Sequence, residues 1–369
     1  MNILWFSEIR WDYLKTRKQH LLSLFPKEDK ILFIQPLSLS KNKFPIEHPK
    51  NIINKTVPIF RRGNRTLIKI AKFSIIRIIT YNLLLRYLKF LIKQHLNDDI
   101  HVICVSNIFF VPLLDKFKYP IIWDFNDDPK QFGEIPNWVY KYYYNLLSDK
   151  NTKIISSSKG FNNYIYSKFS NKPITISNGV DREKFQKQNV LSNNNKIIFG
   201  YVGIISKWFF DFNLIKKIST TYPECEIKIY GPKDKNALDL INEISELNNV
   251  NIFPKQEYDM LPEIMRKFSI GLVPLQSCDK VTRVASGKLL QYLSLGLPVV
   301  SVYMEQFEGL SNLIMCRNHS EFMDGIDYYI NNDLLQDNDI ELTKYDWKVL
   351  ADQYRIELNS SISKHKNTK

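Results

Sequence analysis

Short apolar runs alternate with amphipathic stretches along most of the chain, and this alternation favours strands and helices in turn. Six runs in the first half are expected to be strands, at Asn2–Phe6, 31–35, 101–106, 120–124, 153–157 and 173–177. The second half repeats the pattern, with runs at 196–203, 226–231, 250–253, 268–274 and 298–303. Strands separated by helices pair in parallel, so the pattern predicts an α/β protein with two doubly wound domains facing across a cleft.

Composition and breaks in this pattern predict the domain boundaries. The asparagine-rich stretch 186–195 has the character of a linker, which divides the chain into one domain at 1–188 and another at 189–345. A closing helix and tail are expected at 346–369. Residues 36–60 are punctuated by prolines and are expected to be irregular.

Positive charge is concentrated in the first half of the chain. The formal net charge is +13, and residues 1–188 carry a net +16 whereas residues 189–369 carry a net −3. A basic domain joined to a nearly neutral one indicates an anionic partner for the basic domain. The alternative is that an AT-rich genome enriches lysine and asparagine, which explains the total charge but not its uneven distribution.

Cysteine usage and the length of the apolar runs limit the class of protein. The four cysteines are scattered without a CxxC pair, which disfavours a zinc site or a disulfide scaffold and fits a reducing cytosol. The first residues lack the features of a signal peptide, and no apolar run is long enough to span a bilayer. We therefore expect a cytoplasmic protein.

The segment 61–95 contains nine Lys or Arg residues and no acidic residue, interleaved with apolar side chains. At helical spacing Lys72, Arg86, Lys89 and Lys93 fall on one arc, which is typical of a helix lying in an anionic membrane interface. A core helix whose lysines extend to solvent remains an alternative of equal weight. A nucleic-acid surface is disfavoured because no binding motif accompanies the segment.

The stretch 278–303 has the pattern of an anion site. Ser286, Gly287 and Lys288 begin a helix directly after a polar loop, and the free N–H groups and dipole of a helix N-terminus attract anions. Gly203 follows an earlier strand and lets a backbone approach a ligand, and Lys207 could contact phosphate or sugar. An ordinary strand-to-helix turn is the alternative for Gly203 and Lys207.

Three aspartates, Asp124, Asp127 and Asp128, lie at the carboxyl end of an expected strand, where α/β domains bind ligands. One of them could act as a general base, or they could cap the next turn. A calcium loop is disfavoured because Pro129 and Ile135 stand where such a loop needs Gly and Glu. We expect no metal and no cofactor. No GxSxG or Walker motif is present, so hydrolase and NTPase classes lack support.

The motifs ISNGVD at 176–181 and GKLLQYLSLGLPVVS at 287–301 resemble those of GT-B glycosyltransferases, in particular the retaining family 4 enzymes. The resemblance covers nearly the whole chain and implies two Rossmann-like domains. Family 4 enzymes hold the donor ribose with a glutamate, paired with another earlier in the chain. Gln291 and Arg283 stand at these two positions, so the chain departs from the family pattern.

The spacing of Ser286, Lys288 and Gln291 instead resembles that of the xanthan glucuronosyltransferase, an inverting GT-B enzyme. This resemblance implies that Ser286 and Lys288 bind the diphosphate and that Gln291 binds the ribose. It also implies a catalytic aspartate, for which Asp127 is the first choice. Arg17 and His20 resemble residues that line the acceptor side in related cell-wall glycosyltransferases.

From these resemblances we expect a glycosyltransferase with a nucleotide-sugar donor, in particular a UDP-sugar and possibly UDP-glucuronic acid. The acceptor would be a lipid-linked or surface polysaccharide at the inner face of the cell membrane, with the enzyme peripheral there, and the reaction inverting. The alternatives are a retaining family 4-type transferase and a GT-B sugar-nucleotide epimerase.

Overall fold

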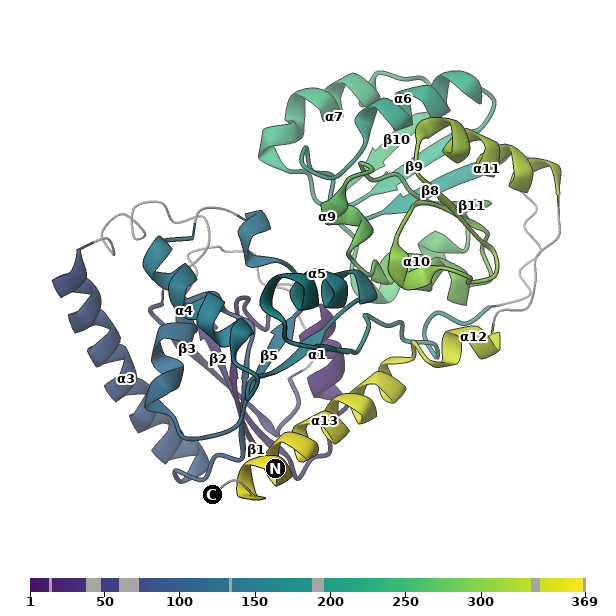
Figure 1. Ribbon diagram of the computed structural model, residues 1–369. Coiled ribbons are helices and arrows are strands. Elements are labelled where there is room, and N and C mark those ends of the chain that lie inside the picture. The colour runs from purple at the N-terminus through teal and green to yellow at the C-terminus, as the bar shows by residue number, and fades with distance from the viewer. Residues whose placement is uncertain are drawn as a thin grey trace. The chain divides into compact units, whose positions relative to one another are not determined.

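A computed structural model describes residues 1–12, 15–37, 48–59, 73–132, 135–187, 196–332 and 339–367. The chain forms two compact units (Figure 1). The first contains Met1–Ile176 together with Leu350–Lys369, and the second contains Ser177–Val349. Each unit has its own parallel sheet, as the alternation of apolar runs predicts.

The first unit is built on a seven-stranded sheet in the order β3-β2-β1-β4-β5-β6-β7, in which every pair is parallel. The central strands are almost wholly apolar because helices cover both faces of such a sheet. The strands are β1 (Asn2–Phe6), β2 (Lys30–Pro36), β3 (Ile52–Val57), β4 (Val102–Val105), β5 (Ile121–Phe125), β6 (Lys153–Ser156) and β7 (Ile174–Thr175).

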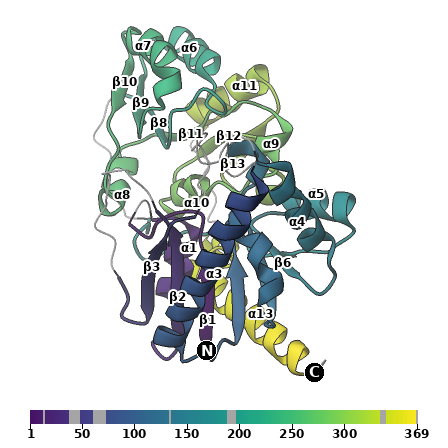
Figure 2. The same ribbon diagram turned by 90° about the vertical axis from the view of Figure 1, so that its left-hand side faces the viewer.

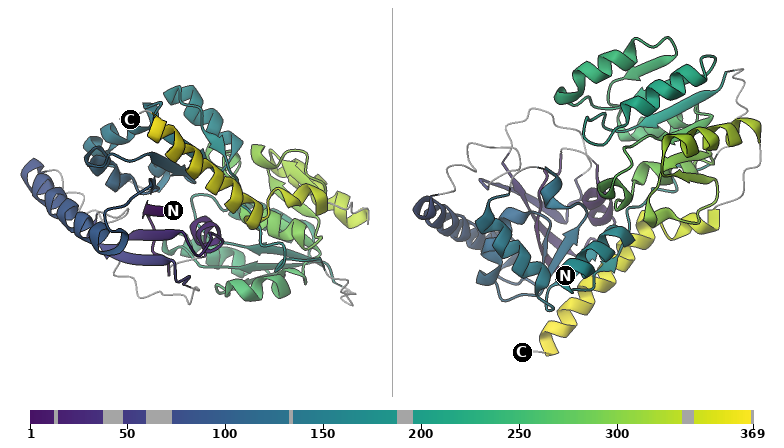
Figure 3. Two further views of the ribbon diagram at one scale, coloured as in Figure 1. Left: turned by 90° about the horizontal axis from the view of Figure 1, so that it is seen from below. Right: turned by 45° about the horizontal axis from the view of Figure 1, so that its top comes forward.

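The helices of the first unit include two long ones. Figure 2 shows α3 (Ser74–Leu96) running across the strands of this unit, and Figure 3 shows α13 (Trp347–Asn367), in yellow, running back along it. The C-terminal helix therefore belongs mostly to the N-terminal unit. The others are α1 (Arg17–Ser23), η1 (Ile108–Lys116), η2 (Pro129–Phe132), α4 (Asn137–Ser148) and α5 (Lys159–Phe169).

The second unit has a six-stranded parallel sheet in the order β10-β9-β8-β11-β12-β13. Its strands are β8 (Ile198–Val202), β9 (Glu226–Tyr230), β10 (Val250–Phe253), β11 (Ile270–Val273), β12 (Val299–Val302) and β13 (Leu313–Cys316). Its helices are α6 (Phe212–Thr221), η3 (Lys235–Ala237), α7 (Leu238–Ser245), η4 (Tyr258–Met260), α8 (Leu261–Met265), α9 (Asp279–Thr282), α10 (Gly287–Ser294), η5 (Glu305–Phe307), α11 (His319–Asn331) and α12 (Asp339–Thr343).

The structure differs from the sequence-based expectation at three points. Within 36–60, expected to be irregular, β3 pairs with β2 at the edge of the first sheet. The second sheet gains β13, which the apolar pattern did not predict. The first unit ends at Ile176 rather than at residue 188, because Val180 forms a bridge with Asp346 and Phe185 enters the second core.

Close packing fixes helix α10 on the second sheet. Its buried face is formed by Leu289, Leu290, Tyr292 and Leu293. A β-carbon on Gly271 of β11 would lie 2.7 Å from the ring of Tyr292, so only glycine permits this approach. The Tyr292 hydroxyl oxygen accepts a hydrogen bond of 2.7 Å from the N–H of Val202, at the end of β8. Helix α10 and the end of β8 are therefore held beside one another.

Candidate functional site

The strand order of the second unit reverses between β8 and β11, and both strands end at the same edge of the sheet. Crevices at such switch points are where doubly wound domains bind ligands. Gly203 follows β8 at this edge, and the loop after β11 leads to Ser286 and Lys288 at the start of α10. The fold thus brings Gly203 beside Lys288, two residues that the sequence analysis proposed separately as ligand contacts.

The ammonium group of Lys288 lies directly against the backbone of Gly203. Its Nζ is 2.7 Å from the point where a β-carbon on Gly203 would stand, and it lies 5.4 Å from the centroid of the Tyr201 ring. Within the described ranges this ammonium has no hydrogen-bond or ion-pair partner. Burial lowers the pKa of Lys288 to about 8, because the charged form loses hydration. A phosphate would supply the missing counter-charge.

The N-terminus of α10 adds backbone donors to this ammonium. Ser286 is the N-cap residue, and its hydroxyl makes no capping hydrogen bond to the helix. The first N–H groups of an α-helix have no partner within the helix, so those of α10 remain for a ligand. The Nδ2 of Asn178 donates to the carbonyl oxygen of Ala285 at 2.8 Å and holds the loop that enters the helix.

Gln291 lies one turn further along α10, beside the hydroxyl of Tyr258. The pKa of Tyr258 is raised well above its ordinary value, mainly by burial and less by the charge of Asp181. A hydrogen bond with Gln291 lowers this pKa in part. Tyr258 follows strand β10 and was not singled out from the sequence, because nothing local marks it as a neighbour of Gln291. Arg283, at the position of the missing glutamate, forms a surface ion pair of 3.2 Å with Asp279.

Lys207 is exposed on the loop that follows β8. Its carbonyl oxygen accepts a hydrogen bond of 3.1 Å from the side chain of Gln276, which anchors this loop to the end of β11. Among the described residues the Lys207 ammonium forms no hydrogen bond or ion pair. Its place in donor binding stays a prediction.

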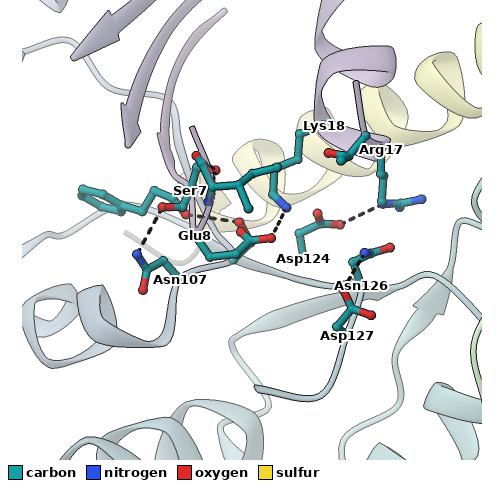
Figure 4. A network of polar contacts seen from close by, with 12 residues as sticks. Ser7, Glu8, Arg17, Lys18, Asn107, Asp124, Asn126 and Asp127 are labelled. Carbon is teal, nitrogen blue, oxygen red and sulfur yellow. Dashed lines mark hydrogen bonds and ion pairs between the residues drawn. The ribbon is translucent and has the colours of Figure 1, made fainter. Parts of the chain in front are cut away.

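In the first unit Asp124 of β5 and the two aspartates that follow the strand have different surroundings, and Figure 4 shows Asp124 and Asp127. Asp124 is buried and forms an ion pair of 3.3 Å with Arg17, whose side chain is also buried. Asp127 is only partly buried, and its Oδ2 accepts a hydrogen bond of 3.0 Å from the Nδ2 of Asn126. Asp128 accepts from the N–H of Lys130 at 3.0 Å, as expected of an aspartate that caps a turn.

Tyr354 of α13 completes the surroundings of Asp124. Its ring lies 5.8 Å from that of Trp5 and 5.9 Å from the guanidinium carbon of Arg17. The pKa of Tyr354 is raised well above its ordinary value, mainly by burial and less by the Asp124 carboxylate. Asp124 is therefore tied into the packing of β1, α1 and α13. Asp127 is only half-buried, unlike Asp124.

The acceptor-side residues predicted from the sequence, Arg17 and His20, are both buried in α1. Arg17 contacts Asp124, so its guanidinium is directed into the unit. A neighbouring ion pair was missed by the sequence analysis: Lys18 donates to Glu8 at 2.6 Å, at the end of β1 (Figure 4). The only sequence signal for it is the charged turn that follows β1.

Helix α3 has one buried and one exposed face. Six residues pack into the unit: Tyr81, Leu84, Leu88, Leu91, Ile92 and Leu96. The opposite face exposes large apolar side chains, among them Ile75 (72% exposed), Ile79 (54%), Leu83 (59%) and Phe90 (59%). Arg86, Lys89 and Lys93 are exposed on the same helix, whereas Lys72 lies outside the described residues. None of the described helices has the length and apolar character needed to cross a membrane.

Comparisons with solved structures identify the fold. The chain superimposes on sucrose-phosphate synthase from Thermosynechococcus elongatus with a TM-score of 0.72 at 11% identity, over 98% of this chain and 99% of that one. The lipopolysaccharide outer core galactosyltransferase WaaB gives a TM-score of 0.66 at 12% identity, over 98% and 99%. The chain has the GT-B fold. HepE of Anabaena in complex with UDP-glucose matches all of both chains, with a TM-score of 0.63 and 14% identity.

No family model matches the chain. Comparison with curated sequences finds a relative that matches only part of it. A stretch of 132 residues is 28% identical to the teichuronic acid biosynthesis glycosyltransferase TuaH of Bacillus subtilis strain 168. The matched part covers 34% of this chain and 33% of TuaH, so the chain spans about a third of the length of this curated relative.

Proposed function

We propose that this GT-B protein is a glycosyltransferase that takes its sugar from a nucleotide donor, specifically a UDP-sugar. The ammonium of Lys288, unpaired among the described residues, carries the proposal, because it lies against Gly203 at a helix N-terminus, where a diphosphate would provide a counter-charge. Ser286 and Gly287 would add hydroxyl and backbone donors, and Gln291 is the proposed ribose contact. The complexes of HepE with UDP and with UDP-glucose support this class of donor.

Asp127 is the proposed general base in an inverting transfer. The acceptor hydroxyl attacks the anomeric carbon, its proton passes to the Asp127 carboxylate, and the bond from that carbon to the diphosphate oxygen breaks. UDP leaves with the bonding electrons, and Lys288 and the first amides of α10 stabilise the developing charge. Asp127 is preferred because Asp124 is committed to Arg17 and Asp128 caps a turn.

The proposed acceptor is a lipid-linked or surface polysaccharide at the cytoplasmic face of the cell membrane. Helix α3 supports this proposal, because its exposed face combines apolar side chains with Arg86, Lys89 and Lys93 and suits an interface rich in anionic lipids. The names of TuaH and WaaB, which refer to teichuronic acid and to lipopolysaccharide, agree with such an acceptor class.

A thermal-shift screen against sugar nucleotides tests the donor proposal, because a ligand that binds the native state raises the melting temperature. The panel includes UDP-glucose, UDP-galactose, UDP-N-acetylglucosamine and UDP-glucuronic acid, with GDP-mannose as a different nucleotide. We expect a shift with at least one UDP-sugar and none with Lys288→Ala. The absence of any shift across the panel would contradict the proposal.

The stereochemistry of the product separates the proposed reaction from its alternatives. Inversion of a UDP-α-sugar gives a β-linked product, whereas a retaining enzyme gives an α-linked one and does not need Asp127 as a base. Conversion of the UDP-sugar to its epimer without any acceptor would indicate an epimerase instead.

A further inference from the structure

The row of side chains with which α3 faces its own unit begins with a cation. Arg77, Tyr81, Leu84 and Leu88 follow one another at intervals of four, three and four residues, which places them on one face of the helix. The last three are buried, and Arg77 at the start of the row is half-buried. A charged group in an otherwise apolar row needs a partner, because burial removes part of its hydration.

The guanidinium group of Arg77 is stacked on an aromatic ring. Its Cζ lies 4.6 Å from the centroid of the ring of Trp138, in the first turn of α4. The Tyr81 ring stands nearly perpendicular to the same indole, with centroids 5.6 Å apart, and its hydroxyl donates to the carbonyl oxygen of Phe109 at 2.8 Å. Stacking uses the face of the guanidinium and fixes its plane, so the N–H donors along its edge remain for an anion.

No oxygen partner satisfies these donors within the parts of the chain that the structure describes. The Arg77 guanidinium forms no hydrogen bond or ion pair there, and the first turn of α3 contains no acidic residue. The Nε1–H of Trp138 is buried and likewise has no acceptor there. Buried donors in folded proteins are almost always paired, because an unpaired one loses its hydration without compensation. A bound anion would supply the missing acceptor oxygens.

Exposed apolar side chains border Arg77 on both sides. Ile76 and Ile78, its neighbours in the chain, are 43% and 57% exposed. Ile75 and Ile79 are exposed as well and continue this surface around the first two turns of α3. The ligand that suits such surroundings is an amphiphilic anion, in which a phosphate is joined to a hydrocarbon chain.

The geometry of Arg77 distinguishes a defined headgroup from a membrane surface in general. The exposed side chains of Arg86, Lys89 and Lys93 are sufficient to attract anionic phospholipids, since that attraction depends on charge rather than on orientation. A half-buried guanidinium with a fixed plane instead favours one headgroup, because its paired N–H groups match two phosphate oxygens.

We propose that Arg77 and Trp138 form a binding site for the phosphate groups of a lipid carrier that bears the acceptor, with the hydrocarbon chain beside Ile76 and Ile78. The inference rests on the proposed transfer to a lipid-linked acceptor. It adds that the enzyme recognises the lipid anchor of that acceptor through the junction of α3 and α4.

Farnesyl diphosphate is a suitable probe, because it joins a diphosphate to a short isoprenoid chain. Isothermal titration calorimetry with saturating UDP, which occupies the Lys288 site, measures its Kd. We expect Arg77→Gln to raise this Kd about tenfold or more, and Trp138→Phe, which keeps a ring but removes the N–H, to raise it about threefold. Farnesol and inorganic diphosphate each carry half of the probe and should bind the wild-type protein about tenfold more weakly or less.

Arg317→Gln is the matched control. Arg317 is also stacked on an aromatic ring, with its Cζ 4.5 Å from the centroid of the Tyr303 ring, but it belongs to the second unit. This variant should leave the Kd of farnesyl diphosphate within about twofold of the wild-type value. Arg77→Gln should leave the Kd of UDP unchanged, and circular dichroism checks that each variant is folded.

Three results would overturn the inference in different ways. If the wild-type protein does not bind farnesyl diphosphate, or a folded Arg77→Gln variant binds it equally well, the lipid-phosphate site is wrong while the donor site stands. If Arg77→Gln reduces flotation with phosphatidylglycerol vesicles as strongly as it reduces probe binding, the site takes bulk phospholipid headgroups instead of the acceptor's anchor. If the wild-type protein binds neither UDP nor a UDP-sugar, the proposed function itself fails.

Discussion

Lys288 Nζ lies 2.7 Å from the position that a β-carbon on Gly203 would occupy, although the two residues come from different strand–helix units of the sheet. Gly203 is therefore required for the position of the ammonium group. Partial loss of hydration lowers the pKa of Lys288, whose half-buried ammonium lies 5.4 Å from the centroid of the Tyr201 ring.

The first prediction concerns pH. The pKa of Lys288 is lowered to about 8 in the free protein, so a growing fraction of the ammonium is lost above that pH. We expect UDP affinity to fall as the pH rises from about 7 to about 9.5, a range in which ordinary lysines keep their charge. Lys288→Arg should show a much flatter profile, because arginine stays protonated throughout. A wild-type affinity that is constant over this range would contradict the assignment.

The same pKa has a consequence for stability. An ammonium whose folded-state pKa lies below its unfolded value of about 10.4 destabilises the folded protein while it is charged. Between about pH 8 and 10.4 the unfolded chain binds more protons than the folded one, so this contribution to the unfolding free energy rises with pH. Relative to Lys288→Met, the wild-type protein without ligand should gain stability across this window. Urea denaturation at several pH values measures the difference.

The second prediction is that Gly203→Ala weakens UDP binding but leaves the protein folded. The added methyl group would lie 2.7 Å from both Cε and Nζ of Lys288 and 2.6 Å from the Tyr201 hydroxyl. The lysine end is flexible and can move away, so the fold should survive. The displaced ammonium should weaken UDP binding by about tenfold or more, the loss of one charged hydrogen bond. Unchanged UDP affinity in a folded variant would show that the contact is not used.

The third prediction distinguishes Asp124 from Asp127. Removing one partner of a buried ion pair leaves an uncompensated charge, so Asp124→Asn should lower the free energy of unfolding by about 3 kcal/mol. Replacing both partners, with Arg17→Met and Asp124→Leu, should cost less than the sum of the two single changes. Urea denaturation of the four proteins measures this coupling, and additive effects would show that the pair contributes little.

Asp127→Asn is expected to lower activity rather than stability. The residue is only partly buried, so the free energy of unfolding should change by no more than about 0.5 kcal/mol. Loss of a general base should lower kcat by about 10²–10⁴-fold while the Kd of the donor is retained. A variant with undiminished kcat would remove Asp127 from the mechanism and would favour a retaining reaction.

The fourth prediction concerns α3 and membranes. Leu83→Gln with Phe90→Gln removes apolar surface from the exposed face, and Arg86→Glu with Lys89→Glu reverses its charge. Both double substitutions should reduce flotation with vesicles containing phosphatidylglycerol. At high salt the charge reversal should no longer reduce flotation, whereas the loss of apolar surface still should. Ile356→Gln is the matched control, because Ile356 is 63% exposed on α13 outside this face. Equal flotation of all variants would refute the membrane surface.

The sequence determined the features that depend on neighbouring residues. Apolar runs of strand length, separated by amphipathic stretches, were sufficient to predict two parallel sheets. The helix start at Ser286 and Gly287 was predicted correctly, because capping and dipole effects act within one turn. β3 was missed because prolines interrupt the segment in which it lies, and its partner β2 stabilises it from outside that segment.

The tertiary structure decided which distant residues meet, because crossover connections place the ends of separate strands side by side. It set the half-buried side chain of Lys288 against Gly203, which no local pattern predicts. It also gave the three aspartates different surroundings, since Arg17 from α1 and Tyr354 from α13 close around Asp124, whereas Asp127 is only half-buried. Charge and capping can be predicted from the chain, whereas burial and partners are set by contacts that form only when the sheets assemble.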